Sequence, residues 1–471
     1  MDCRTTAGEK GDRRMRPGIT RLVSPRPAPH QRYIPIPRSR WHLPALYPGE
    51  PETCARSLRT FLAIWAHLGL LIAVLRVYKV EGRAFQLVVT LALAALPVHY
   101  LLSYRWKKPF FVATSVAGLV WIFGPAVGAI VLALAAVLIG ICFLPIAWAG
   151  RAAIIAVFAV ILTVLRGSTT GALSDCAWPV IGTMFMFRMI LYLYELKHAE
   201  KRDSLLDTLS YFFLLPNYCF PHFPVVDFRT FQRGYFAGEI HATQRRGMQM
   251  MFRGTTHLLL FRLVYHTLMM PAEQVHNLAT LAAYIVCNYL CYLQVSGQFH
   301  IACGLLHLFG FQLPETHRHY LLASSFTDYW RRINIYWKDF MVRVVFNPVA
   351  FRLKRWPQAM ALAVATVTVF LATWLLHAYQ FYWLRGTWRF NWPDALFWGI
   401  LGVLVMVNVQ LDALAPRRRS RQPVELSPRA IALRTVKITA TFTTIALLWS
   451  LWSSPSLGSW LGMIRRAFAV A

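Results

Sequence analysis

The chain has 471 residues, of which 57% are hydrophobic and only 15% are charged, and its formal net charge is +29. A soluble domain usually carries about 25% charged residues, so this composition excludes an ordinary soluble domain. The Lys and Arg residues fall in short clusters between apolar runs, as in the loops of membrane proteins. We therefore expect membrane lipids as partners of these clusters, and no nucleic acid.

Several long runs contain no Asp, Glu, Lys or Arg at all. They lie between Lys108 and Arg151, Glu273 and Glu315, Arg355 and Arg385, and Lys437 and Arg465. Each is longer than the roughly 20 apolar residues that a helix needs to cross a bilayer. None shows the regular alternation of a membrane β-barrel. The sequence predicts an all-α polytopic membrane protein with about 10–12 transmembrane helices, supplemented by re-entrant and interfacial helices.

Four regions follow one another along the chain. Residues 1–59 are rich in Arg and Pro and are predicted to be a disordered basic tail, and residues 60–170 hold the N-terminal transmembrane helices. Residues 171–415 form the core that carries the chemistry, and residues 416–471 hold a basic loop and a C-terminal transmembrane helix. We expect an integral, multi-pass protein of the bacterial inner or plasma membrane, whose oligomeric state the sequence does not indicate.

The predicted spans in chain order are Phe61–Leu75, Phe85–Tyr104, Phe110–Phe123, Ala126–Ala147, Ala152–Leu165, Trp178–Leu196, Leu205–Leu215, a weaker pair around Met250–Met270, Ala279–Leu293, Ile301–Phe311, Ala361–Leu384, Ala395–Leu411 and Ile438–Trp452. Several are shorter than about 17 residues, so we expect some to be tilted, paired or re-entrant.

Three segments do not look like plain spans. Leu215–Pro224 contains three prolines and cannot form a regular helix. Val295–His300 interrupts an uncharged run with Gly297 and polar groups, which predicts a broken helix. Ser324–Arg355 is aromatic and basic, so it is predicted to lie in the membrane interface.

His377 is an ionisable residue near the end of an apolar span. Such residues are costly in a membrane and are functional-site candidates by default. Histidine suits general base catalysis because its pKa lies near neutral pH, and an apolar surrounding favours the neutral ring that accepts a proton. The alternative is a packed histidine that hydrogen-bonds a neighbouring helix.

A second polar stretch lies at Asp328–Phe340. If it is one helix, spacings of three and four residues place two sets on separate faces. One set is Tyr329, Arg332 and Ile333, and the other is Trp330, Asn334, Trp337 and Lys338. An Asn amide among aromatic rings could donate to an oxyanion or orient a carbonyl. The alternative is an ordinary interfacial helix with an incidental Asn.

The remaining histidines and cysteines give weaker signals. His317 and His319 have the spacing of half a metal site, but Glu315 is the only carboxylate nearby, so we expect no metal. His300 and His307 could share a helix face and are interpreted as packing residues. The eight cysteines form no Cys-x-x-Cys pair and mostly lie in apolar runs.

Several of these segments together resemble the membrane-bound O-acyltransferase family. The similar segments are Ser325–Trp337, which resembles the family signature; Ser296–Gly304 with Leu308–Phe311 and Pro314-Glu315; Pro216–Phe228; and Trp374–His377. The likeness covers about Trp178 to Asp412, and the order of the segments is more specific than any one of them. Ile333-Asn334-Ile335 differs from the Trp-His-Ile of the polysaccharide-acetylating branch, and Ala378 replaces the Gly that often follows the histidine.

The resemblance implies transfer of an acyl group from a thioester to a hydroxyl of a lipid, a glycan or a small metabolite, inside a central catalytic chamber. It implies that His377 is the general base and Asn334 its companion. No bound cofactor is expected; acyl-CoA or an acyl-carrier protein would be the donor. We expect Arg331, Arg332 and Lys338 to attract donor phosphates.

Three further residues are predicted to contact substrate, namely Trp330, Trp374 and Gln298. The rival prediction is a polytopic transporter or flippase-like protein, because broken helices at Ser296-Gly297 and Pro216–Pro224 would suit a transport path. A third possibility is a catalytically silent lipid-binding protein with the same fold.

Overall fold

The computed structural model describes residues 51–54, 56–168, 177–198, 203–220, 226–414 and 427–469. Residues 1–50 of the predicted tail, part of the Pro-rich segment (221–225) and most of the basic loop (415–426) lie outside this description. The α-helices are α2 (Leu58–Val77), α3 (Arg83–Leu101), α4 (Tyr104–Phe123), α5 (Pro125–Phe143), α6 (Trp148–Ser168), α7 (Ala177–Val180), α8 (Arg188–Leu196), α9 (Leu205–Phe212), α10 (Phe228–Gly234), α11 (Ile240–Leu263), α12 (Leu278–Leu290), α13 (Leu293–Leu308), α14 (Phe326–Arg332), α15 (Ile335–Met341), α16 (Asn347–Arg352), α17 (Gln358–Arg385), α18 (Trp392–Leu414), α19 (Pro428–Ser453) and α20 (Leu457–Ala469).

Wider π-helical turns join some of these helices, at Ile181–Phe187, Val264–Leu268 and Val342–Phe346. Short 3₁₀ turns occur at Glu52–Cys54, Leu215–Tyr218, Ala272–Gln274 and Tyr320–Leu322. Within the described ranges the regular structure is helical throughout, apart from one isolated β-bridge between Tyr235 and Phe311.

Eight of the described helical segments are long and apolar enough to cross a membrane, with α12 and α13 taken as one. The protein is therefore an all-α, multi-pass membrane protein, as the composition predicted. This number is lower than the predicted one, because α4 and α11 are not among the eight and because two other predicted spans are short or divided. The run Trp178–Leu196 is divided into α7, a π-helical turn and α8, and Leu205–Leu215 yields only the short helix α9.

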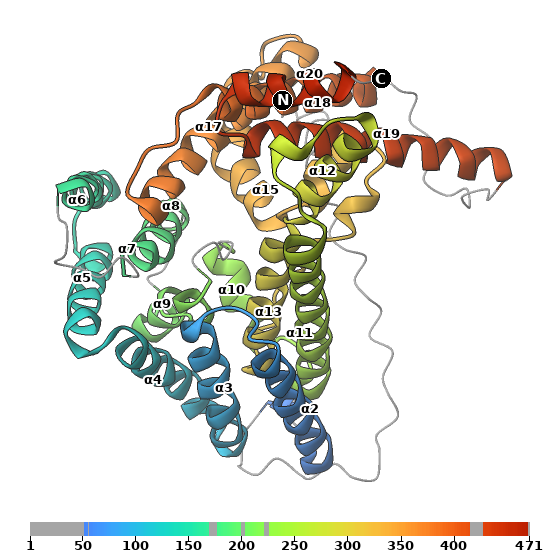
Figure 1. The fold of residues 1–471 in the computed structure, drawn as a ribbon. Coiled ribbons are helices and arrows are strands. Elements are labelled where there is room, and N and C mark those ends of the chain that lie inside the picture. The colour runs from blue at the N-terminus through green and yellow to red at the C-terminus, as the bar shows by residue number, and fades with distance from the viewer. Residues whose placement is uncertain are drawn as a thin grey trace, which may run out of the picture.

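Figure 1 shows how these helices are arranged. Helices α2 to α6 follow one another around the lower and left sides, α11 and α13 stand upright beside each other in the centre, and α17 to α20 lie across the top (Figure 1). The N-terminal part of α19 extends away from the rest, and its residues from Pro428 to Lys437 are exposed.

Glycines allow the central helices α11 and α13 to approach until their backbones touch. A Cβ added at Gly254 would lie 2.6 Å from the carbonyl oxygen of Gly297, and one at Gly304 would lie 2.5 Å from that of Gly247. The predicted break at Val295–His300 is therefore wrong, because α13 runs through Gly297 and the chain turns earlier, at Cys291. Gly297 serves close helix packing rather than helix breaking.

The buried apolar residues form two large clusters. The first joins α2 to α5, α7 to α10 and parts of α11 and α13. The second joins the segment from α14 to α19, and its partly buried members include Trp330, Trp337 and Trp374. Two of the predicted substrate residues, Trp330 and Trp374, therefore belong to the second cluster.

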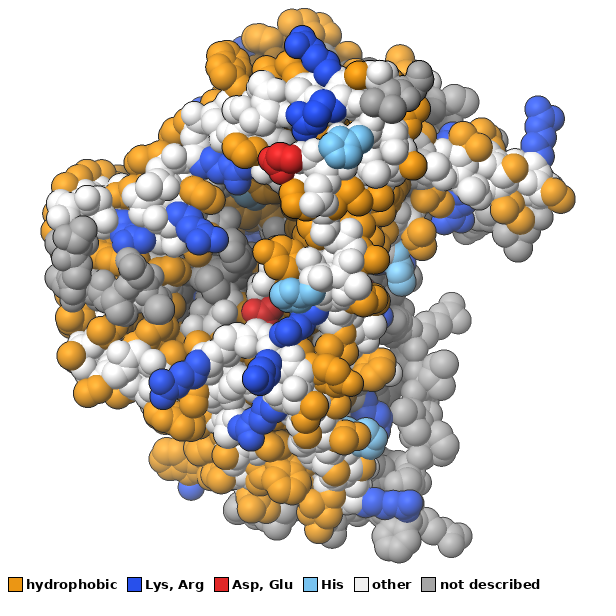
Figure 2. Space-filling view, in the orientation of Figure 1, with side chains coloured by type: hydrophobic (Ala, Val, Ile, Leu, Met, Phe, Trp, Pro, Cys, Tyr) orange, Lys and Arg blue, Asp and Glu red, His pale blue; other side chains and the backbone are white. Residues whose placement is uncertain are grey.

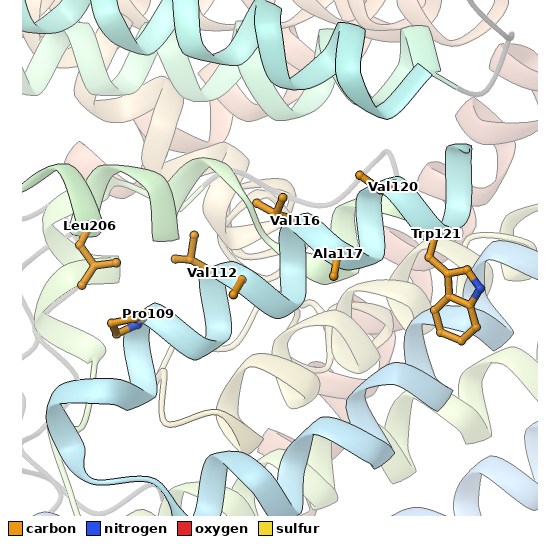
Figure 3. Close-up of a pocket in the computed structure, with 8 residues that line it drawn as sticks. Pro109, Val112, Val116, Ala117, Val120, Trp121 and Leu206 are labelled. Atoms are coloured by element: carbon orange, nitrogen blue, oxygen red, sulfur yellow. The ribbon is translucent and has the colours of Figure 1, made fainter. Parts of the chain in front are cut away.

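An apolar groove of about 740 Å³ lies along one face of α4 (Figure 3). Its lining residues are Pro109, Val112, Ala113, Val116, Ala117, Val120, Trp121 and, from α9, Leu206. The groove shares no residue with the predicted catalytic site. The central chamber thus stays a prediction.

Candidate functional site

His377 lies on α17 between two indole rings. Its ring centroid is 4.7 Å from that of Trp337 and 4.6 Å from that of Trp398. Its Nδ1 lies 2.9 Å from the carbonyl oxygen of Thr373, one helical turn earlier. A carbonyl oxygen can only accept, so in the neutral ring Nδ1 carries the hydrogen and Nε2 carries the lone pair. The side chain is partly buried, so the two indole rings cover only part of the imidazole.

Asn334 stands at a sharp break in the chain rather than inside a helix. Its backbone has φ 37° and ψ 64°, a left-handed conformation that Asn tolerates better than most residues. Its Oδ1 accepts a hydrogen bond from the backbone N–H of Trp337 at 3.3 Å and so caps α15. The prediction that Asp328–Phe340 forms one helix with two faces is therefore wrong, because α14 ends at Arg332 and α15 begins at Ile335.

Trp337 connects the two predicted catalytic residues. Its backbone N–H bonds Asn334, its ring meets His377 edge to face, and its Nε1 lies 3.5 Å from Thr373 Oγ1. Asn334 and His377 therefore both contact Trp337, the first through its backbone and the second through its ring. The Asn334 Nδ2 group remains the end of the amide that can donate to a ligand.

Two of the three predicted phosphate-binding cations have carboxylate partners. Arg332 Nε lies 2.7 Å from Asp328 Oδ1, and the buried Lys338 pairs with Asp339. Arg331 is exposed at the end of α14. A donor phosphate would have to compete with Asp328 for Arg332 and with Asp339 for Lys338. By exposure, Arg331 is the most accessible of the three.

Asp394, which the sequence analysis did not single out, binds two indole N–H groups close to His377. It is only 2% exposed, and it accepts hydrogen bonds from Trp374 Nε1 at 2.6 Å and Trp452 Nε1 at 2.5 Å. Trp374 lies about one turn before His377 on α17, and Trp398 lies one turn after Asp394 on α18. The indole of Trp374 therefore anchors this carboxylate, and the two helices are tied together beside His377. A lone acidic residue at the start of an apolar run was the available sequence signal.

The remaining predicted substrate residues lie in two different places. Trp330 packs against Phe370, with ring centroids 4.7 Å apart, inside the same cluster as the site. Gln298 instead lies on α13, and its Nε2 donates to Glu81 Oε1 at 3.1 Å, in the turn between α2 and α3. Burial raises the pKa of Glu81, and the hydrogen bond from Gln298 opposes this rise because it stabilises the carboxylate. No contact of Gln298 described here reaches His377.

Comparison with known proteins leaves the family open. No protein-family model matches the chain, and no curated protein matches it significantly.

Proposed function

We propose that the protein is a membrane-embedded O-acyltransferase, which moves an acyl group from a thioester to a hydroxyl. The observation that supports this proposal best is the state of His377. Its Nδ1 lies 2.9 Å from the Thr373 carbonyl oxygen, so the neutral ring has its lone pair on Nε2, and two indole rings pack against the partly buried imidazole. A general base needs such an oriented, neutral imidazole.

In the proposed step, the acceptor oxygen attacks the thioester carbonyl carbon while His377 Nε2 takes the hydroxyl proton. A C–O bond forms, and the carbonyl oxygen becomes an oxyanion. Asn334 Nδ2 donates a hydrogen bond to this oxygen. The C–S bond then breaks, and the leaving thiolate receives the proton from His377, so the net products are an ester and a thiol.

The donor would be acyl-CoA or the acylated arm of a carrier protein, and the membrane would be the bacterial inner or plasma membrane. Arg331 is the cation best placed for donor phosphates, because it is exposed whereas Arg332 is partly buried and Lys338 is buried. The rival transporter prediction rested partly on a broken helix at Gly297, and α13 is continuous there.

The test compares lipid and glycan extracts by mass spectrometry from cells that lack the gene and from cells that express wild type or a variant. Wild type should restore one acyl mass difference, and His377→Ala should not, while both accumulate equally in the membrane. The matched control is His67→Ala, because His67 is an exposed histidine whose Nδ1 also lies near a carbonyl one turn earlier, that of Ala63. Wild-type acylation in the His377→Ala strain would end the proposal.

A further inference from the structure

Three histidines from separate parts of the chain meet beside the central helix pair. His257 belongs to α11, His300 to α13, and His317 to the segment after α13. The ring centroids of His257 and His300 are 5.3 Å apart, and those of His300 and His317 are 5.9 Å apart. His257 is partly buried, whereas His300 and His317 are 3% and 2% exposed. The cluster thus runs from the edge of the protein into its interior.

Hydroxyl groups complete this cluster. His257 Nδ1 lies 2.9 Å from Ser296 Oγ, and the OH of Tyr292 lies 2.9 Å from His317 Nε2. His300 Nδ1 donates to the carbonyl oxygen of Ser296 at 2.6 Å, which leaves the lone pair on Nε2. That Nε2 is buried and has no hydrogen-bond partner among the described residues. An unpaired buried polar atom costs about 1–3 kcal/mol, so a partner from outside the chain would stabilise it.

One end of the cluster adjoins the proposed catalytic turn. Two backbone hydrogen bonds, of 3.0 and 2.8 Å, join residues 316–318 to residues 332–335. His317 therefore lies alongside the segment that contains Asn334.

An exposed charged edge lies near the cluster, since Arg253 is one turn before His257 on α11 and Glu315 is two residues before His317. Arg246 and Arg253 on α11 lie 4.0 and 3.9 Å from Glu315, at the limit of an ion pair, and all three are partly exposed. Figure 2 shows basic, acidic and histidine side chains close together at the edge of a hollow over α11 and α13. Loose, exposed ion pairs contribute little to stability, so these groups can move aside for a polar ligand.

We propose that the cluster formed by His257, Ser296, His300 and His317 binds the polyhydroxylated head group of the acceptor. This proposal rests on the proposed function. A neutral imidazole and a hydroxyl each offer both a donor and an acceptor, and this pairing matches sugar or polyol hydroxyls. A sterol offers a single hydroxyl, which could pair with one of these groups but not with the several that a sugar or polyol would reach. Burial lowers the pKa of His317 well below its ordinary value, so the ring stays neutral and keeps both functions. No three metal-ligating side chains in the described residues are placed to hold a metal ion.

The experiment measures binding of two radiolabelled ligands to the full chain in phosphatidylcholine nanodiscs, without an acyl donor. Octyl β-D-glucoside and 1-octanol share an alkyl chain and differ only in the sugar, and binding to empty nanodiscs is subtracted. Wild type should bind the glucoside at least about tenfold more tightly than the alcohol. His300→Leu should weaken glucoside binding about tenfold and leave octanol binding unchanged, because it removes one hydrogen-bond acceptor.

The matched control is His307→Leu. His307 is also on α13, is 0% exposed, and has its Nδ1 2.8 Å from the carbonyl oxygen of Cys303, but it lies outside the cluster. The His307→Leu variant should bind both ligands as tightly as wild type does. Equal binding of the two ligands by wild type, or equal losses in the two variants, overturns the proposal. If His300→Leu does not elute as a folded species, Ser296→Ala takes its place with the same two outcomes.

This binding readout does not depend on turnover. Failure of the His377→Ala test would remove the acyl transfer reaction and leave the sugar preference intact. Failure of the glucoside test would remove this site and leave the reaction intact.

Discussion

The helix pair α17–α18 and the helix pair α11–α13 each contain a histidine that is oriented by the same backbone hydrogen bond, but the two histidines have different neighbours. In each, a histidine donates its Nδ1–H to the carbonyl one turn earlier, Thr373 for His377 and Ser296 for His300. Indole rings surround the first, whereas imidazole rings and hydroxyls accompany the second. The two imidazoles therefore differ in their neighbours and not in their helical geometry, and on this difference we propose proton transfer for His377 and hydroxyl binding for His300.

The largest expected effect separates these two histidines kinetically. His377→Ala should lower kcat about 10²–10⁴-fold, because a general base contributes that much. His300→Leu should instead raise KM for the acceptor about tenfold with a smaller change in kcat. Initial rates of acyl transfer over a range of acceptor concentrations give both constants. Identical losses of kcat in the two variants would contradict the division of roles.

The next effect is on stability and tests how closely the helices pack at α13 and at α18. Gly304→Ala should destabilise the protein by about 1–3 kcal/mol, since the new methyl would lie 2.5 Å from the carbonyl oxygen of Gly247. Gly399→Ala on α18 is the matched control, because nothing lies within 4 Å of its added Cβ. Thermal unfolding in detergent measures both. A control that melts as early as Gly304→Ala would refute the contrast in packing.

A smaller effect is expected at the carboxylate that ties α17 to α18. Asp394→Asn replaces one acceptor oxygen by a donor that faces an indole N–H, which costs about 1–3 kcal/mol. We expect kcat to fall about tenfold through displaced indole rings, with KM for the acceptor little changed. Asp412→Asn, at an exposed position of the same helix, should keep both constants. If Asp394→Asn altered KM alone, the carboxylate would belong with binding instead.

The smallest effect is a pH dependence outside both helix pairs. Burial, reinforced by nearby Asp227, raises the pKa of Glu195 on α8 from 4.5 to about 7, although Arg343 opposes the rise. The folded state therefore binds this proton more tightly than the unfolded state does, so the contribution to stability is largest below about pH 4.5 and is lost as the pH rises through 7.

Glu195→Gln mimics the protonated acid and should lack this dependence. From pH 5 to pH 7.5 the free energy of unfolding of wild type should fall relative to that of Glu195→Gln, by no more than about 3 kcal/mol. Melting temperatures of the two proteins over this pH range measure the change. Glu273→Gln, in an exposed turn before α12, should follow wild type. A difference that stays constant with pH would show that Glu195 does not titrate in this range.

Composition and apolar runs were enough to predict the helical membrane fold and a histidine inside the helix α17. They could not predict the break at Asn334, because periodicity within one segment does not reveal a left-handed residue. They also missed Asp394, whose indole partners Trp374 and Trp452 lie on two other helices. Both features depend on contacts between segments that are distant in the chain.

The histidine cluster was missed for the same reason. From the sequence, His300 is interpreted as a packing residue, and His317 is considered only as half of a metal site and set aside, because each is compared only with its own neighbours in sequence. Only the folded chain brings α11, α13 and the following loop together. Gln298 shows the converse, since a residue in a promising segment faces the α2–α3 turn instead.

The left-handed backbone of Asn334 constrains how its chemistry can be dissected. Substituting alanine would delete the amide and also strain the turn, so a loss of activity would have two causes. Asn334→Gly permits the same backbone angles without a side chain, and Asn334→Asp keeps the acceptor that begins α15 while removing the donor. That pair of replacements separates the shape of the loop from the hydrogen bond that it presents.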